Sequence, residues 1–72
     1  MKIEKLVYMA NQIGDFFKHE KEDAAVRQIA VHLKSFWEKR MLEQIFAYLE
    51  AGGDGLHERV RKAVASLQHE NA

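Results

Sequence analysis

The chain has 72 residues, 11 basic and 11 acidic side chains, and neither cysteine nor proline. This length provides one small domain, and the lack of cysteine excludes a disulfide framework, a thiolate zinc site and an iron–sulfur cluster. A net charge of zero gives no general attraction to nucleic acid or anionic membranes, and 47% apolar residues is too much for a disordered tail.

The first half of the sequence predicts two helices. Apolar residues from Ile3 to Phe17 form one stripe with the 3.6-residue period, which predicts a helix over about 3–18. A second stripe predicts a helix over about 24–37. Because one continuous helix would rotate the stripe by about 140° between the two segments, we expect a break near 19–23. Asp23 is the expected N-cap of the second helix.

The second half predicts two more. A third stripe indicates a helix over about 39–51, and a phase jump of similar size is the only sign of the corner before it. Gly52 and Gly53 then end this helix, because glycine adopts the positive φ of a C-cap. A narrower stripe predicts a fourth helix over about 55–69, beginning at Asp54 or Gly55.

The predicted fold is all-α, a single small domain over 1–72 in which four short helices pack as a bundle. Connections of two to five residues make sequential helices packed neighbours. A chain of this size buries only about 60% of its unfolded surface, so its core is thin and a stabilising partner is expected.

Residues for catalysis or metal binding are scarce. Four histidines supply the bases near neutral pH, but none has a second histidine three or four residues away: His19, His32, His57 and His69. The two serines, Ser35 and Ser66, do not lie in a glycine-rich elbow. We therefore expect no catalytic residue, no metal site and no cofactor.

Nucleic acid and membranes are not the expected partners either. The fourth helix carries Arg59, Arg61 and Lys62, but Glu58 and Glu70 share its polar surface. No apolar run approaches the ~18–20 residues of a membrane span, and the first residues lack the apolar run of a signal peptide. The expected localisation is cytoplasmic.

The chain has more apolar surface than a thin core requires. Met9 and Phe16 lie seven residues apart, so they form one ridge, displaced by about 100° from the core stripe of the first helix. Methionine and large aromatic residues are typical of protein interfaces. The alternative is that the four-helix core absorbs them. Gly14, inside the first stripe, indicates close approach of the second helix or of a partner.

Three blocks carry a resemblance to a known family. Residues 9–17, Met-Ala-Asn-Gln-Ile-Gly-Asp-Phe-Phe, resemble the delta subunit family of NAD-dependent formate dehydrogenase. The blocks Phe36–Met41 and Ala51–Leu56 follow in the family's order, so that the resemblance covers 3–67. The family commonly has proline where this chain has Lys39.

The resemblance implies a small, cofactor-free subunit or assembly factor of a cytoplasmic molybdenum or tungsten formate dehydrogenase, which oxidises formate to carbon dioxide and reduces NAD. This chain would be non-catalytic and would dock on the complex, in the first place on the large molybdopterin-containing subunit. It would stabilise that subunit or help it to mature. A homodimer is also considered, and the alternative function is a free-standing homodimeric adaptor. A small DNA-binding regulator is a third hypothesis.

The candidate contact residues follow from the exposed ridge and from the motif positions. They are Met9, Asn11, Gln12, Phe16, Trp37, Arg40 and Met41. The guanidinium of Arg40 is suited to a bidentate contact with a carboxylate.

Overall fold

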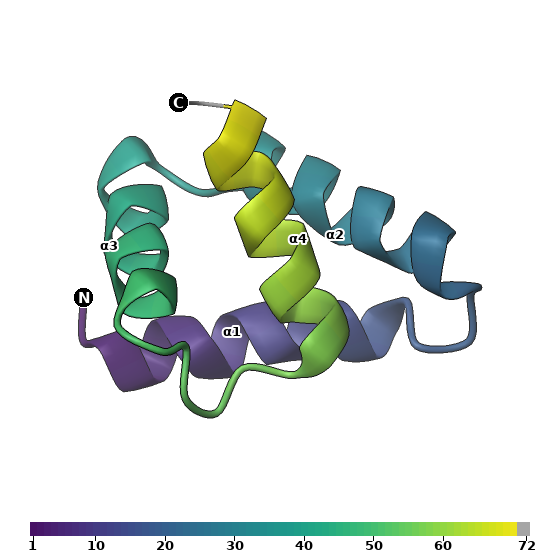
Figure 1. Ribbon diagram of the computed structural model, residues 1–72, viewed down its shortest axis with the longest axis horizontal. Coiled ribbons are helices and arrows are strands. Elements are labelled where there is room, and N and C mark those ends of the chain that lie inside the picture. Colours follow the sequence, from purple (N-terminus) through teal and green to yellow (C-terminus); the bar gives the residue numbers. More distant parts are fainter. Residues whose placement is uncertain (71–72) are drawn as a thin grey trace.

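The computed structural model describes residues 1–70, and the last two residues of the predicted domain lie outside this range. Its four helices are α1 (Ile3–Phe16), α2 (Glu22–Phe36), α3 (Lys39–Glu50) and α4 (Glu58–Glu70) (Figure 1). No strand occurs among residues 1–70, and the predicted all-α bundle is confirmed.

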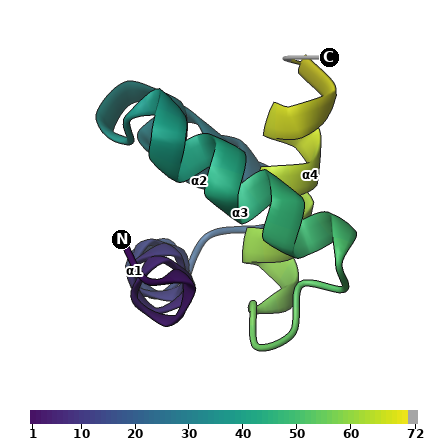
Figure 2. The ribbon, with the colours of Figure 1, turned by 90° about the vertical axis from the view of Figure 1, so that its left-hand side faces the viewer.

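The last helix, α4, is the centre of the arrangement. It packs against each of the other three helices, whereas α2 and α3 contact each other only marginally. The expectation that all sequential helices are packed neighbours is therefore wrong for this pair. Figure 1 shows α1 and α2 running in opposite directions, with α4 crossing in front of them, and the view along α1 places α4 on one side of that pair (Figure 2).

The core is entirely apolar. Seven large side chains are completely or almost completely enclosed, and α4 contributes three of them: Leu6, Ile29, Leu33, Ile45, Val60, Val64 and Leu67. Each predicted stripe supplies at least one of these residues. Phe36 departs from its stripe, because 73% of its surface is exposed although the second stripe includes it.

The first break lies at 17–21, slightly earlier than predicted. The helix α2 begins at Glu22, with the extended residue Lys21 at its N-cap, and no side chain caps it. The expected capping role of Asp23 is wrong, because the N–H of Ala25 already donates to the carbonyl of Lys21 at 2.8 Å. Asp23 instead lies in the first helical turn, where its negative charge is favourable.

The corner between α2 and α3 is formed by two extended residues. Trp37 has ψ 137° and Glu38 has ψ 157°, and α3 begins directly afterwards at Lys39. The break required by the phase jump is confirmed, and it forms without proline. This corner sends α3 away from α2 and keeps Trp37 at the point where the two helices part.

The glycine pair ends α3 as predicted. Gly52 and Gly53 have φ values of 126° and 61°. The N–H of Gly53 donates to the carbonyl of Tyr48 at 2.9 Å, and that of Gly52 donates to the carbonyl of Leu49 at 3.0 Å. These two bonds form a Schellman C-cap, which satisfies carbonyls that the helix leaves free.

The fourth helix begins later than predicted, at Glu58 and not at Asp54 or Gly55. Gly55 has φ 88°, which a helix cannot accommodate, and the N–H of Leu56 donates back to the carbonyl of Gly53 at 3.1 Å. The chain therefore makes a second turn before α4 begins, and the connection is longer than the two to five residues expected.

Gly14 is buried, and the close approach that it indicated comes from α4. A β-carbon at position 14 would lie 2.6 Å from Cγ2 of Val60, but 3.9 Å from Cδ1 of Ile29 on α2. The nearest neighbour of Gly14 is thus α4. The expectation that the second helix or a partner approaches at this position is wrong.

Candidate docking site

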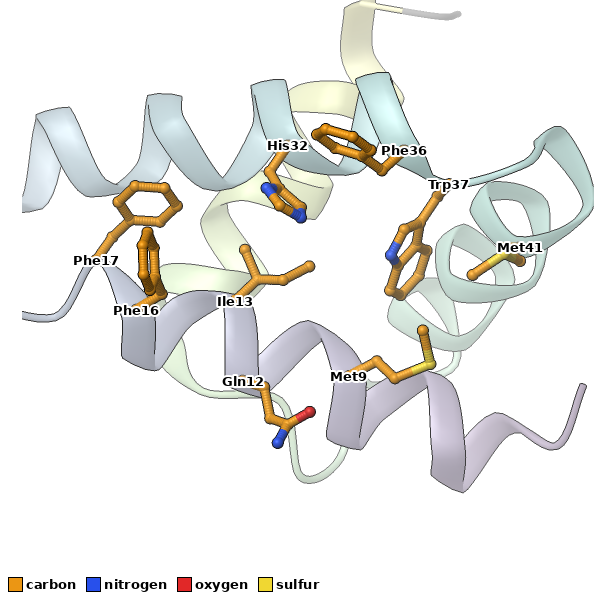
Figure 3. Close-up of a pocket in the computed structure, with 9 residues that line it drawn as sticks. All are labelled: Met9, Gln12, Ile13, Phe16, Phe17, His32, Phe36, Trp37 and Met41. Atoms are coloured by element: carbon orange, nitrogen blue, oxygen red, sulfur yellow. The ribbon is translucent and has the colours of Figure 1, made fainter.

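An open groove of about 520 Å³ lies between α1 and α2. Figure 3 views this groove with α4 behind the two helices, so it opens on the side that α4 does not cover. Its lining residues come from α1, from α2 and from the start of α3: Met9, Gln12, Ile13, Phe16, Phe17, His32, Phe36, Trp37 and Met41.

The α1 wall is an apolar ridge. Met9, Ile13 and Phe16 lie at positions i, i+4 and i+7 of the helix and therefore share one face. Phe16 is 80% exposed because its position is displaced from the stripe that holds Leu6 and Ala10 in the core. The ring of Phe17 packs edge-on against the ring of Phe16, with centroids 5.0 Å apart, at the end of the groove near the α1–α2 turn (Figure 3).

The opposite wall comes from α2. His32 and Phe36 are one turn apart, and their ring centroids lie 4.7 Å from each other.

Trp37 closes the end of the groove and is only 8% exposed. The side chains of Met9 and Met41 extend toward each other at this same end (Figure 3). The two ends of the groove are thus both aromatic.

The lining contains no formally charged residue; its polar groups are the amide of Gln12, the imidazole of His32 and the indole N–H of Trp37. A second hollow of about 510 Å³ near the start of α3 differs, since Lys34, Lys39 and Glu43 take part in its lining. An apolar concave surface between helices is the kind of site that binds an apolar group of a ligand or of another protein.

The structure brings together five of the seven candidate contact residues. Met9, Gln12, Phe16, Trp37 and Met41 all line the groove. Arg40 is exposed at the start of α3, next to Met41 in the chain, and Asn11 lies elsewhere on α1. Whether these residues contact a partner stays a prediction.

Sequence reasoning did not select four of the lining residues as contacts. Ile13, Phe17 and Phe36 belong to predicted core stripes, and His32 was only one of four scattered histidines. The available signal was the adjacent aromatic pairs Phe16–Phe17 and Phe36–Trp37, since neighbouring helical residues point about 100° apart and two large rings widen the apolar face beyond a thin core.

Asn11 uses both ends of its amide within the chain. Its Nδ2 donates to the carbonyl of Gly55 at 2.9 Å, and its Oδ1 accepts from the N–H of His57 at 2.9 Å. Asn11 therefore fixes the turn before α4 to α1.

Two further side chains hold the same connection. The phenol of Tyr48 donates to the carbonyl of Asp54 at 2.6 Å. Nη1 of Arg61 donates to the carbonyls of Gly52 and Gly53 at 2.9 and 2.8 Å. The glycine-rich segment is consequently a braced turn, with its carbonyls directed at side chains of this chain.

The basic residues of α4 are likewise engaged within the chain. Besides Arg61, Arg59 donates to the carbonyl of Glu20 at 2.7 Å, and Lys62 pairs with Glu22 at 3.0 Å. The hydrogen bond and charge of Lys62 lower the pKa of the Glu22 carboxyl, and Glu22 in turn raises the pKa of Lys62. These three cations therefore do not form an unpartnered basic face.

Among residues 1–70 we also looked for a metal site, for buried polar groups and for a membrane-spanning helix. No group of three His, Asp or Glu side chains in this range is placed to hold a metal ion. Among the same residues, none that is buried is polar or charged. None of the described helices is both long and apolar enough to span a membrane.

The comparisons with known proteins agree with the sequence blocks. The family model described as NADH-dependent formate dehydrogenase delta subunit FdsD matches residues 5–64. Neither the curated proteins nor the solved structures give a match. The family match spans the groove, the Trp37 corner and the braced turn, and covers most of the 72 residues. The chain therefore belongs to the family of formate dehydrogenase delta subunits and associates with the other subunits of that enzyme.

Proposed function

We propose that this chain is a non-catalytic subunit that docks on the formate dehydrogenase complex through the groove between α1 and α2. The observation that carries the proposal is the exposure of Phe16 and Phe36, at 80% and 73%, on the two walls of an uncharged groove. Burying a large aromatic side chain contributes about 1.5–3 kcal/mol, so covering both walls is strongly favourable.

The non-catalytic role is supported by the chemistry of the described residues. Catalytic acids, bases and nucleophiles usually lie in clefts where burial or a charged partner shifts their pKa values. The polar groups of the otherwise apolar groove are an amide, one imidazole and one indole N–H. Glu22 and Lys62, whose pKa values are shifted, form an exposed ion pair elsewhere. The groove is therefore suited to contact with another protein and not to catalysis.

The proposed partner is the large molybdopterin-containing subunit in the cytoplasm. A subunit that binds only the folded form of its partner stabilises that form by mass action, without taking part in its chemistry. The chain would act in this way, as a permanent stabilising subunit or during assembly of the complex.

Deleting the chain from its host tests this role. We expect less assembled complex and less molybdenum per large subunit, whereas turnover per bound molybdenum stays unchanged. Restoring the unchanged chain should recover assembly, whereas restoring the Phe36→Ser variant should not. The matched control is Val31→Ser, a substitution at a 53% exposed position of α2 outside the groove lining, which should recover assembly. Unchanged assembly with reduced turnover per molybdenum would refute the non-catalytic role.

A further inference from the structure

We propose that the groove holds two turns of an amphipathic helix from another subunit of the complex, with an acidic residue at the end near Arg40. This inference rests on the proposed function and specifies what docks. The occupant would present apolar anchors at positions i, i+3 or i+4, and i+7, as helices in grooves commonly do.

The dimensions of the groove fit a short helical segment. Its α1 wall extends from Met9 to Phe16, and seven residues at 1.5 Å each give about 10.5 Å, or two helical turns. Aromatic side chains limit both ends, Phe17 at one and Trp37 at the other (Figure 3). An occupant longer than two turns would continue outside the groove.

The walls are also suited to a helix as a third element. The residues Lys5, Met9, Gln12 and Phe16 follow the 4-3-4 spacing of a helix ridge that packs beside another helix. On the facing wall, α2 runs antiparallel to α1 (Figure 1) and places His32 and Phe36 one turn apart. A third helix between them would have its backbone hydrogen bonds satisfied internally, whereas an extended segment would find no strand edge among residues 1–70.

Charge defines the orientation of the occupant. The lining contains no Asp, Glu, Lys or Arg residue, but Lys5 lies one turn before Met9 on α1 and Arg40 directly precedes Met41 in the chain. Met9 and Met41 themselves lie at the Trp37 end of the groove (Figure 3). Both cations are exposed and neither forms an ion pair with another described residue. A carboxylate on the occupant at this end is therefore complementary, and the guanidinium of Arg40 can bind it through two parallel hydrogen bonds.

A second copy of the chain fits this surface less well. Two grooves facing each other are both concave, so Phe16 and Phe36 alone would have to fill the volume of about 520 Å³ in each. A stable interface buries about 800 Å² on each partner. That is a large share of the 4985 Å² total surface. A helix that belongs to a larger subunit can add contacts outside the groove.

Photo-crosslinking in the purified complex tests the occupant. The photoreactive analogue p-benzoylphenylalanine replaces Phe16 or Phe36, with Val31 as the control position on α2. We expect positions 16 and 36 to capture the same peptide of another subunit, with the predicted apolar spacing and an acidic residue at the Arg40 end. Capture of a second copy of the chain, or an extended peptide without that spacing, would overturn the inference.

Affinity measurements complete the test. A synthetic peptide of the captured segment should bind the isolated chain about tenfold more weakly after Phe16→Ser or Phe36→Ser. Arg40→Glu should weaken peptide binding by a similar factor. A peptide whose acidic residue is changed to lysine should bind the Arg40→Glu variant with restored affinity. Arg27→Glu is the control and should leave the affinity unchanged. Folding of each variant is checked by circular dichroism.

The outcomes separate the two proposals. If positions 16 and 36 crosslink to another subunit at a segment that lacks the predicted spacing or the acidic residue, this inference fails while docking through the groove stands. If neither position crosslinks to another subunit although the chain stays in the complex, docking through the groove fails as well. If the chain does not associate with the complex at all, the proposed function fails as well.

Discussion

A β-carbon on Gly14 of α1 would lie 2.6 Å from Cγ2 of Val60 on α4, far inside van der Waals contact. Val60 is completely buried and its branched side chain has little freedom to move. The absence of a side chain at position 14 is therefore what lets α4 approach α1 closely.

Gly14→Ala should destabilise the fold despite the higher helix propensity of alanine. Overpacking costs about 1–3 kcal/mol, which outweighs the ~1 kcal/mol that alanine contributes inside a helix. In a Val60→Ala background the obstructing methyl groups are absent, so Gly14→Ala should then stabilise by up to about 1 kcal/mol. Urea unfolding of the four proteins measures this change of sign, and additive effects of the two substitutions would contradict the proximity.

Asn11→Ala should destabilise the connection before α4. It removes the partner of the N–H of His57 and of the carbonyl of Gly55, and because water can reach both groups the cost is about 0.5–1.5 kcal/mol per bond. Asn11→Asp keeps only the acceptor and should have an intermediate effect. Gln12→Ala is the control, because Gln12 is exposed and bonds only to Tyr8. Faster hydrogen exchange of the His57 amide in Asn11→Ala than in the control is the expected signature.

Lys39→Pro should be neutral or stabilising by about 0.4–1 kcal/mol. Lys39 is the first residue of α3, where proline is favoured, and the preceding Glu38 is already extended, as a residue before proline must be. Glu43→Pro, in the interior of the same helix, should instead cost about 3 kcal/mol or more. Thermal unfolding measures both, and a loss of stability in Lys39→Pro would show that the corner tolerates only a flexible residue.

The ion pair of Glu22 with Lys62 should contribute to the pH dependence of stability. Because Lys62 lowers the pKa of Glu22 in the folded chain, the contribution is present above the unfolded pKa and is lost as the pH falls through the folded one. At high pH the same pair is lost as Lys62, whose pKa is raised, deprotonates. A carboxyl NMR titration should show the Glu22 pKa rising in Lys62→Gln, and high salt should weaken the effect since both groups are about half exposed.

Most of the fold follows from the spacing of apolar residues. The four stripes identify the helices, and all residues of the fourth stripe, from Leu56 just before α4 to Leu67 within it, are buried. Helix ends were harder to predict. Asp23 has the chemistry of a cap, but the backbone bond from Ala25 to Lys21 begins the helix earlier. The start of α4 depends on Asn11, more than forty residues away, which no local pattern reveals.

The groove was predictable only in part. The offset of Met9 and Phe16 from the core stripe was visible from periodicity, and both residues line it. The exposure of Phe36 could not be predicted. A helical wheel gives the direction of its side chain, but it does not say whether another helix packs on that side. That gap arises because α3 turns away after Trp37 and leaves α2 without a packed neighbour there.

The central place of α4 has a consequence for the timing of assembly. This helix packs against each of the other three helices, and its residues 58–70 follow α1, α2 and α3 in the chain. While residues 58–70 are still inside the ribosome, α1 and α2 lack the helix against which both of them pack. We therefore expect the spacing of α1 and α2, and with it the shape of the groove, to become fixed only after α4 has left the ribosome, so that a partner bound through the groove would be recognised after this segment is translated.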